Sequence, residues 1–325
     1  MKINTTFKPA PLLQNPHLQT LFATFARKDR LEGARTEFFS LDDGDEVECV
    51  WYGETPSKEK PLVVLFHGLE GSVESPYIIG TMKGLDRAGY ASVLMHFRGC
   101  GSKPNNKPRA YHSGDTADAK VWIAHLHRTY PDVSLYAIGF SIGGNVLLKL
   151  LGEWGVDAPL RAAVAVSVPM RLDISADTLE KGFAKLYQGY LLRPLKERLL
   201  EKYDRFDMEA LLGIDVKRVK AIQTIREFDN LYTAKIHGFG SAEAYYAASS
   251  SRQYLKGIAV PTLIIHAKDD PFMTPEVLPN EDELSSSVTL EVHEHGGHVG
   301  FVSGSLFKPE YWLEERIVAF LEEVQ

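Results

Sequence analysis

The chain has 325 residues, of which 44% are hydrophobic and 24% are charged, and its formal net charge at pH 7 is −7. This composition is typical of a globular protein that buries a large core, and it excludes a disordered or fibrous chain. The acidic balance and the lack of a clustered lysine and arginine run argue against a nucleic-acid partner.

Cysteine usage and hydropathy predict where the protein resides. Cys49 and Cys100 are too few for a disulfide framework, which favours a reducing compartment. The residues after Met1 lack the apolar run of a signal peptide, and the sequence has no apolar stretch of about 18 residues that would span a membrane. We therefore expect a cytoplasmic protein without a transmembrane segment.

The first part of the chain contains a predicted hairpin. Residues 36–41 and 47–52 flank a turn of three aspartates and one glycine at 42–45. Such a turn between two extended runs favours an antiparallel pair. We expect these two strands at an edge of a sheet.

The rest of the chain alternates short apolar runs with helical patterns, which is typical of a mostly parallel sheet with helices on both faces. The runs, rich in Val, Ile, Leu and Ala, predict strands at residues 62–66, 91–97, 135–139, 162–168, 260–265 and 288–292. The helical patterns lie at residues 78–88, 116–129, 142–154 and 312–323. The fold class is therefore α/β.

The alternation is interrupted once. From 172 to 255 the strand signal disappears, and apolar residues recur at helical spacing, as in Phe183, Leu186 and Tyr190. We predict a helical cap inserted into a core built from residues 1–171 and 256–325. The aromatic stripe is interpreted as packing against the main body.

Ser141 lies in the pentapeptide Gly-Phe-Ser-Ile-Gly at residues 139–143, between a predicted strand and a predicted helix. Glycines two positions either side of the serine let the strand and the helix approach while Oγ points out of the sheet edge. The pentapeptide alone is equally consistent with a plain tight turn. The strand before it and the helix after it favour a nucleophile.

A serine nucleophile needs a histidine base held by a carboxylate, in the chain order Ser, acid, His. Asp269 and Asp270 follow the penultimate strand, where catalytic loops occur. A pattern cannot separate adjacent residues in a loop. Asp270 is favoured because Pro271 makes the loop after it rigid, and Asp269 stays as the alternative acid.

Three histidines compete for the role of base. His293 and His295 continue the alternation of the last strand, whereas His298 follows two glycines that let the chain turn back toward the sheet edge. We therefore predict His298. A metal site built from the three histidines is the alternative reading, but the segment lacks a matched carboxylate or cysteine spacing.

Two backbone N–H groups are needed to stabilise the oxyanion of an acyl transfer. One belongs to Ile142, the residue after the serine, and the other to Leu69 in the His-Gly-Leu-Glu-Gly loop at residues 67–71. His67 is interpreted as bracing that loop rather than transferring a proton.

These segments together resemble the YheT-like branch of the α/β-hydrolases, which is related to eukaryotic ABHD-type lipid esterases. The motifs that carry the resemblance span most of the chain, at residues 15–20, 67–72, 96–101, 139–145 and 267–271. The resemblance implies the α/β-hydrolase fold with a helical cap and carboxylic ester hydrolysis by Ser141, Asp270 and His298. It implies no metal or organic cofactor.

The expected partner is thus a small-molecule ester, with lipid esters among the candidates. Two rival functions are weighed against a serine esterase. The same triad runs thioester hydrolysis or acyl transfer, and a hydrolase fold without catalysis binds an apolar ligand in the same pocket.

Overall fold

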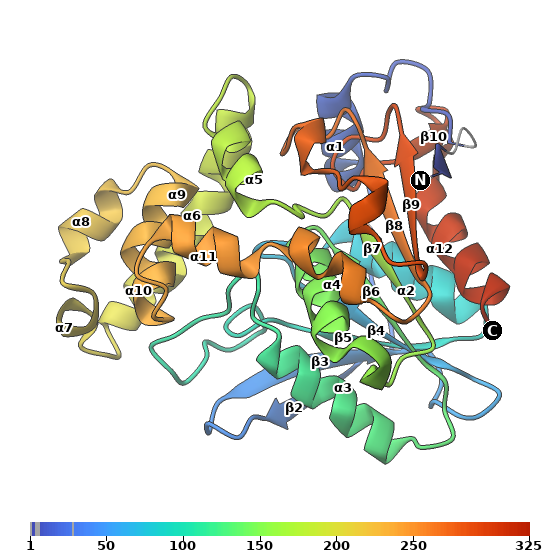
Figure 1. The fold of residues 1–325 in the computed structure, drawn as a ribbon, viewed down its shortest axis with the longest axis horizontal. Helices are drawn as coiled ribbons and strands as arrows, with labels where there is room; N and C mark the ends of the chain where they lie inside the picture. The colour runs from blue at the N-terminus through green and yellow to red at the C-terminus, as the bar shows by residue number, and fades with distance from the viewer. Residues whose placement is uncertain (1, 4–6, 28) are drawn as a thin grey trace.

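The fold is built on one large sheet. The computed structural model describes residues 2–3, 7–27 and 29–325, and within these the sheet has nine strands in the order β1-β9-β8-β7-β6-β4-β5-β3-β2 (Figure 1). The strands are β1 (Lys2–Ile3), β2 (Arg35–Ser40), β3 (Glu46–Tyr52), β4 (Leu62–Phe66), β5 (Ala91–Met95), β6 (Leu135–Phe140), β7 (Ala162–Val166), β8 (Thr262–Ala267) and β9 (Val288–His293). Neighbours pair in parallel from β1 to β5, whereas β3 pairs antiparallel with both β5 and β2.

Helices cover both faces of this sheet, so the central strands carry apolar side chains on both sides. Val64 of β4 packs in one cluster with α3 (Ala117–Thr129) and α4 (Ile142–Trp154). The neighbouring Val63 packs in a second cluster with α2 (Pro76–Arg87) and α12 (Trp312–Glu323). Every residue of β4, β5, β6, β7 and β8 is buried as a result.

A run of helices separates β7 from β8. It comprises α5 (Leu172–Leu179), α6 (Ala184–Tyr203), α7 (Met208–Leu212), α8 (Val216–Ala221), α9 (Ile225–Phe228), the π-helical turn η2 (Asp229–Thr233), α10 (Ala234–Ile236) and α11 (Ala242–Ser249). We call residues 172–249 the helical insertion. Its helices α6 to α11 gather beside the sheet (Figure 1). Helices α6 to α10 share an apolar cluster that includes Leu199, Met208 and Phe228, and α11 packs with α5 in a second one.

Shorter elements complete the chain. An N-terminal helix, α1 (Pro16–Phe25), lies near a two-stranded ribbon of β10 (Val302–Gly304) and β11 (Pro309–Tyr311). The remaining turns are η1 (Gly155–Asp157), η3 (Ser251–Gly257), η4 (Pro275–Val277) and η5 (Glu281–Glu283). None of the helices in the described part of the chain is both long enough and apolar enough to cross a membrane.

The strands and helices predicted from hydrophobic patterns are present, with ends that differ by a few residues. The predicted hairpin is β2 and β3, although only β2 lies at the edge, because β5 pairs with the other side of β3. The interpretation of the aromatic stripe holds for Tyr187, which is buried against Leu21 and Phe272, and it is wrong for Leu186 and Tyr190, which are 64% and 69% exposed. Phe183, although 48% exposed, contacts the ring of His17 on α1, with centroids 4.4 Å apart.

Candidate active site

Ser141 occupies a sharp turn between β6 and α4. Its backbone has φ 52° and ψ −121°, a conformation that L side chains rarely adopt, and a residue held there costs about 1–3 kcal/mol. The turn is held because the Ser141 N–H donates to the carbonyl of Val166 on β7 at 2.8 Å. The predicted turn from strand to helix is therefore present.

Gly139 and Gly143 make this turn sterically feasible. A Cβ added to Gly143 would lie 2.4 Å from the carbonyl oxygen of His67, and one added to Gly139 would lie 2.5 Å from the carbonyl oxygen of Gly143. Both contacts are with backbone, which cannot rotate away. The glycines let α4 approach β4 and β6, as the pentapeptide predicts.

We expect Gly143→Ala to lower the free energy of unfolding by about 1–3 kcal/mol, because the methyl group forces α4 away from β4. Gly189→Ala is the matched control, since Gly189 lies in α6 with no atom within 4 Å of an added Cβ. That variant should gain about 0.5–1 kcal/mol from helix propensity. Urea denaturation measures both, and equal midpoints for the two variants would contradict this account.

His298 and Asp270 come together from the loops after β9 and β8. The two side chains meet with His298 Nδ1 and Asp270 Oδ2 2.8 Å apart, and the Asp270 side chain is fully buried. The second oxygen of Asp270 accepts from the Phe272 N–H at 2.8 Å. This leaves Nε2 as the ring nitrogen of His298 that does not face the carboxylate.

Asp269 points elsewhere. One of its oxygens accepts from the Gly297 N–H at 3.0 Å, and the other lies 3.1 Å from Nδ1 of His295. Burial raises the pKa of this carboxyl above its ordinary value. Asp269 therefore shapes the loop that carries His298 without contacting its ring. Of the two adjacent aspartates, Asp270 is the one whose carboxylate contacts His298.

The three histidines after β9 face three different carboxylates. His293 Nε2 lies 3.0 Å from Glu291 Oε1, while His295 and His298 face Asp269 and Asp270. Across the described ranges, no group of three or more His, Cys, Asp or Glu side chains is arranged to hold a metal ion. Their separate partners give no support to the alternative reading of a histidine metal site.

Two contacts that fix His298 were not predicted from the sequence. The ring stacks on Phe272, with centroids 4.0 Å apart and an interplanar angle of 8°. Its backbone N–H donates to Oγ1 of Thr20 on α1 at 2.9 Å. On the same helix, the Gln19 side chain exchanges two hydrogen bonds with the backbone of Val302.

The motif at residues 15–20, which also carries the family resemblance, contains the signal for the α1 contacts. Asn15 caps α1 by accepting from the N–H groups of His17 and Leu18. The cap fixes where the helix starts, so that Gln19 and Thr20 face the loop of His298. No comparable signal marks Phe272.

The loop after β4 is held from several sides. His67 accepts from the Phe97 N–H at Nε2 and donates from Nδ1 to the Gly68 carbonyl, and burial lowers its pKa to about 3. It therefore stays neutral and acts as a brace, as interpreted from the sequence. Tyr77 accepts from the Gly68 N–H at 2.9 Å.

Glu70 anchors the other end of that loop. It has a positive φ of 53°, and its N–H donates to the Tyr111 hydroxyl at 3.0 Å. The same hydroxyl donates to one oxygen of the Glu70 carboxylate at 2.9 Å, and Nε of Arg198 on α6 donates to the other at 2.5 Å. Leu69, between Gly68 and Glu70, is thereby held in a fixed backbone conformation.

A pocket of about 610 Å³ brings four of the five predicted site residues together, and Asp270 lies outside its lining. We call it the wide pocket. Its walls include Ser141, His298, Leu69 and Ile142, together with Phe272 beneath the histidine ring. Residues from four separate loops, far apart in the sequence, thus share one space.

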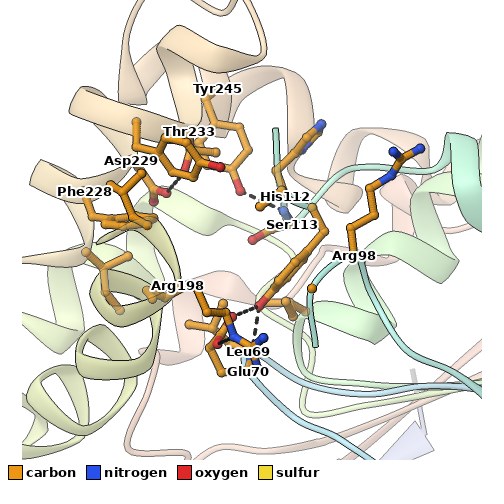
Figure 2. A pocket seen from close by; sticks show the side chains of 18 of the residues that line it. Leu69, Glu70, Arg98, His112, Ser113, Arg198, Phe228, Asp229, Thr233 and Tyr245 are labelled. Atoms are coloured by element: carbon orange, nitrogen blue, oxygen red, sulfur yellow. Dashed lines mark hydrogen bonds and ion pairs between the residues drawn. The ribbon is translucent and has the colours of Figure 1, made fainter. Parts of the chain in front are cut away.

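A second cavity of about 110 Å³ lies under the helical insertion. We call it the narrow cavity. Figure 2 shows Phe228 and Asp229 on one side of it and Leu69 and Glu70 on the other. The buried Asp229 accepts from the hydroxyls of Thr233 and Tyr246 at 2.8 and 2.7 Å, and burial raises its pKa to about 6.

The chain is similar to known proteins over most of its length. The family model described as alpha/beta hydrolase fold matches residues 61–305. The YheT protein of Escherichia coli (strain K12) is 43% identical over 97% of this chain and 92% of its own length. Phospholipase ABHD3 of Bos taurus is 29% identical over 93% of this chain and 74% of its own length.

Among solved structures, an esterase of Pyrococcus furiosus superimposes with a TM-score of 0.60 at 19% identity, over 90% of this chain and 91% of that one. This likeness supports the same arrangement of sheet and helices.

Proposed function

The chain belongs to the α/β-hydrolase fold family, in the branch of YheT, and from this premise we propose that it is a serine esterase. Ser141 is the nucleophile, His298 the base and Asp270 the acid. The observation that carries the proposal is the 2.8 Å contact between His298 Nδ1 and Asp270, in a pocket that also exposes Ser141 at its sharp turn. Phospholipase and monoacylglycerol lipase among the relatives support a lipid-type ester as the substrate.

The reaction has two halves in this proposal. Ser141 Oγ attacks the ester carbonyl as its proton passes to Nε2 of His298, and Asp270 stabilises the imidazolium that forms. The N–H groups of Leu69 and Ile142 hold the oxyanion. His298 then protonates the departing alcohol. In the second half, a water molecule attacks the acyl carbon as its proton passes to the same nitrogen, and this proton returns to Ser141 Oγ as the carboxylic acid leaves.

The insertion acts as a cap in this proposal. Its helix α6 reaches the loop of Leu69 through the ion pair of Arg198 with Glu70, and the insertion supplies much of the wall of the narrow cavity.

A fluorophosphonate probe tests the proposal on the unmodified protein. We expect a covalent adduct that peptide mass spectrometry places on Ser141, formed in step with the loss of p-nitrophenyl butyrate hydrolysis. Heat-unfolded protein is the control and should not be labelled. Absence of both an adduct and turnover would contradict the proposal and favour a non-catalytic binder. Faster turnover of acyl thioesters than of matched esters would instead point to thioester chemistry.

A further inference from the structure

The wide pocket and the narrow cavity meet at the oxyanion residues. Leu69 and Ile142 line both spaces. Among the described residues, Ser141 and His298 belong to the lining of the wide pocket alone. An ester carbonyl on Ser141 would therefore lie at the junction, with one side of the substrate directed into each space.

This inference rests on the proposed function, because the chemistry of ester hydrolysis decides which space binds the acyl part of the ester and which binds the alcohol part. The leaving oxygen receives its proton from His298, so it has to lie within hydrogen-bond reach of that ring. The alcohol side of the ester is therefore on the side of the wide pocket. We propose that the wide pocket binds the alcohol part of the substrate and the narrow cavity binds the acyl chain.

The walls of the narrow cavity suit an apolar chain. Apolar side chains of the helical insertion form much of its surface: Leu172, Ala176, Leu179, Leu195, Leu199 and Phe228.

Polar groups on the same walls already have protein partners. Asp229 accepts from Thr233 and Tyr246, and the Tyr245 hydroxyl accepts from the Ser113 N–H at 2.8 Å. An acyl chain entering here would leave these hydrogen bonds intact.

Cavity size restricts the acyl chain more than the alcohol. An apolar cavity of about 150 Å³ holds one benzene molecule, so the 110 Å³ of the narrow cavity corresponds by proportion to roughly four carbon atoms. The wide pocket, at 610 Å³, accommodates a much larger group. The substrate class is accordingly an ester of a short acid with a bulky alcohol.

Two ester series separate the sides of the substrate. In the first, p-nitrophenyl esters run from acetate to dodecanoate, and in the second, acetate esters run from ethanol to dodecanol. We expect kcat/KM to fall steeply beyond about five acyl carbons, the carbonyl carbon at Ser141 and roughly four more, because the narrow cavity is then full. It should fall little as the alcohol lengthens.

Matched alanine-to-leucine variants assign each space. Ala176 on α5 lines the narrow cavity and Ala23 on α1 lines the wide pocket. Ala176→Leu should lower the butyrate-to-acetate ratio of kcat/KM at least about tenfold and leave the dodecyl-to-ethyl ratio of the alcohol series unchanged. Ala23→Leu should lower the alcohol ratio and leave the acyl ratio unchanged.

Leu195→Ala enlarges the narrow cavity, whereas Ala176→Leu fills it. Leu195 is a half-buried residue of the cavity wall. Leu195→Ala should raise the octanoate-to-butyrate ratio about tenfold, and it keeps the test valid if Ala176→Leu fails to fold in thermal melting. The assignment would be overturned if Ala176→Leu lowered the alcohol ratio and Ala23→Leu lowered the acyl ratio, or if none of the variants changed the dependence of kcat/KM on acyl length. In either case Ser141 would still be labelled by the probe. Loss of labelling and turnover in the unmodified protein would instead overturn the proposed function.

Discussion

Ser141→Ala is expected to lower kcat for ester hydrolysis by on the order of 10⁶-fold, because the acyl-enzyme can no longer form. The remaining rate would come from the oxyanion donors and substrate binding alone. The fold should persist, since Ser141 meets Val166 through its backbone N–H, which alanine retains. Steady-state hydrolysis of p-nitrophenyl butyrate and far-UV circular dichroism measure the two effects.

Ser72→Ala is the control for this variant. Ser72 lines the same wide pocket, and its hydroxyl accepts from the Glu74 N–H, so its loss should change kcat less than about tenfold. Substantial turnover by purified Ser141→Ala, with a well-folded spectrum, would remove Ser141 from the nucleophile's role.

The second large effect is expected from Asp270→Asn, which should lower kcat by on the order of 10⁴-fold. An amide NH₂ facing Nδ1 of His298 favours the tautomer that carries its proton on Nε2, and that nitrogen can then no longer accept the proton of Ser141. Asp269→Asn should cost less than about tenfold. Its amide oxygen still accepts from the Gly297 N–H, and the contact that it alters is with His295.

Both asparagine variants are measured with the same ester and checked by thermal melting, because each removes a negative charge from the same loop. A larger loss for Asp269→Asn than for Asp270→Asn would move the acid to the neighbouring residue. Equal losses would indicate that the loop, and not one carboxylate, supports His298.

The sheet was predictable because each of its longer strands leaves a signal within a few consecutive residues. Each buried strand is a short apolar run, and the strand-to-helix turn at Ser141 needs glycines at fixed positions, so both leave a pattern in consecutive residues. Such a signal could not separate Asp269 from Asp270. Adjacent side chains in a loop point in different directions, and only the path of the backbone decides which one meets His298.

Features that depend on distant partners left weaker signals. Phe272 is one aromatic residue in a loop until the chain folds and places it under the ring of His298. The strand β1 is two residues long and is defined by its pairing with β9. The exposed part of the α6 stripe shows the converse, since helical spacing predicts a helix but does not reveal whether its apolar face is covered.

Helix α1 has a consequence for how this protein divides into parts. It holds the backbone of His298 through Thr20, and it touches the insertion, where His17 Nδ1 lies 3.1 Å from the Tyr187 hydroxyl of α6. Both contacts come from residues ahead of the segment, 61–305, that matches the family model. The insertion and α1 therefore depend on each other's side chains. A chimera that carries the insertion of a relative would need that relative's first helix as well.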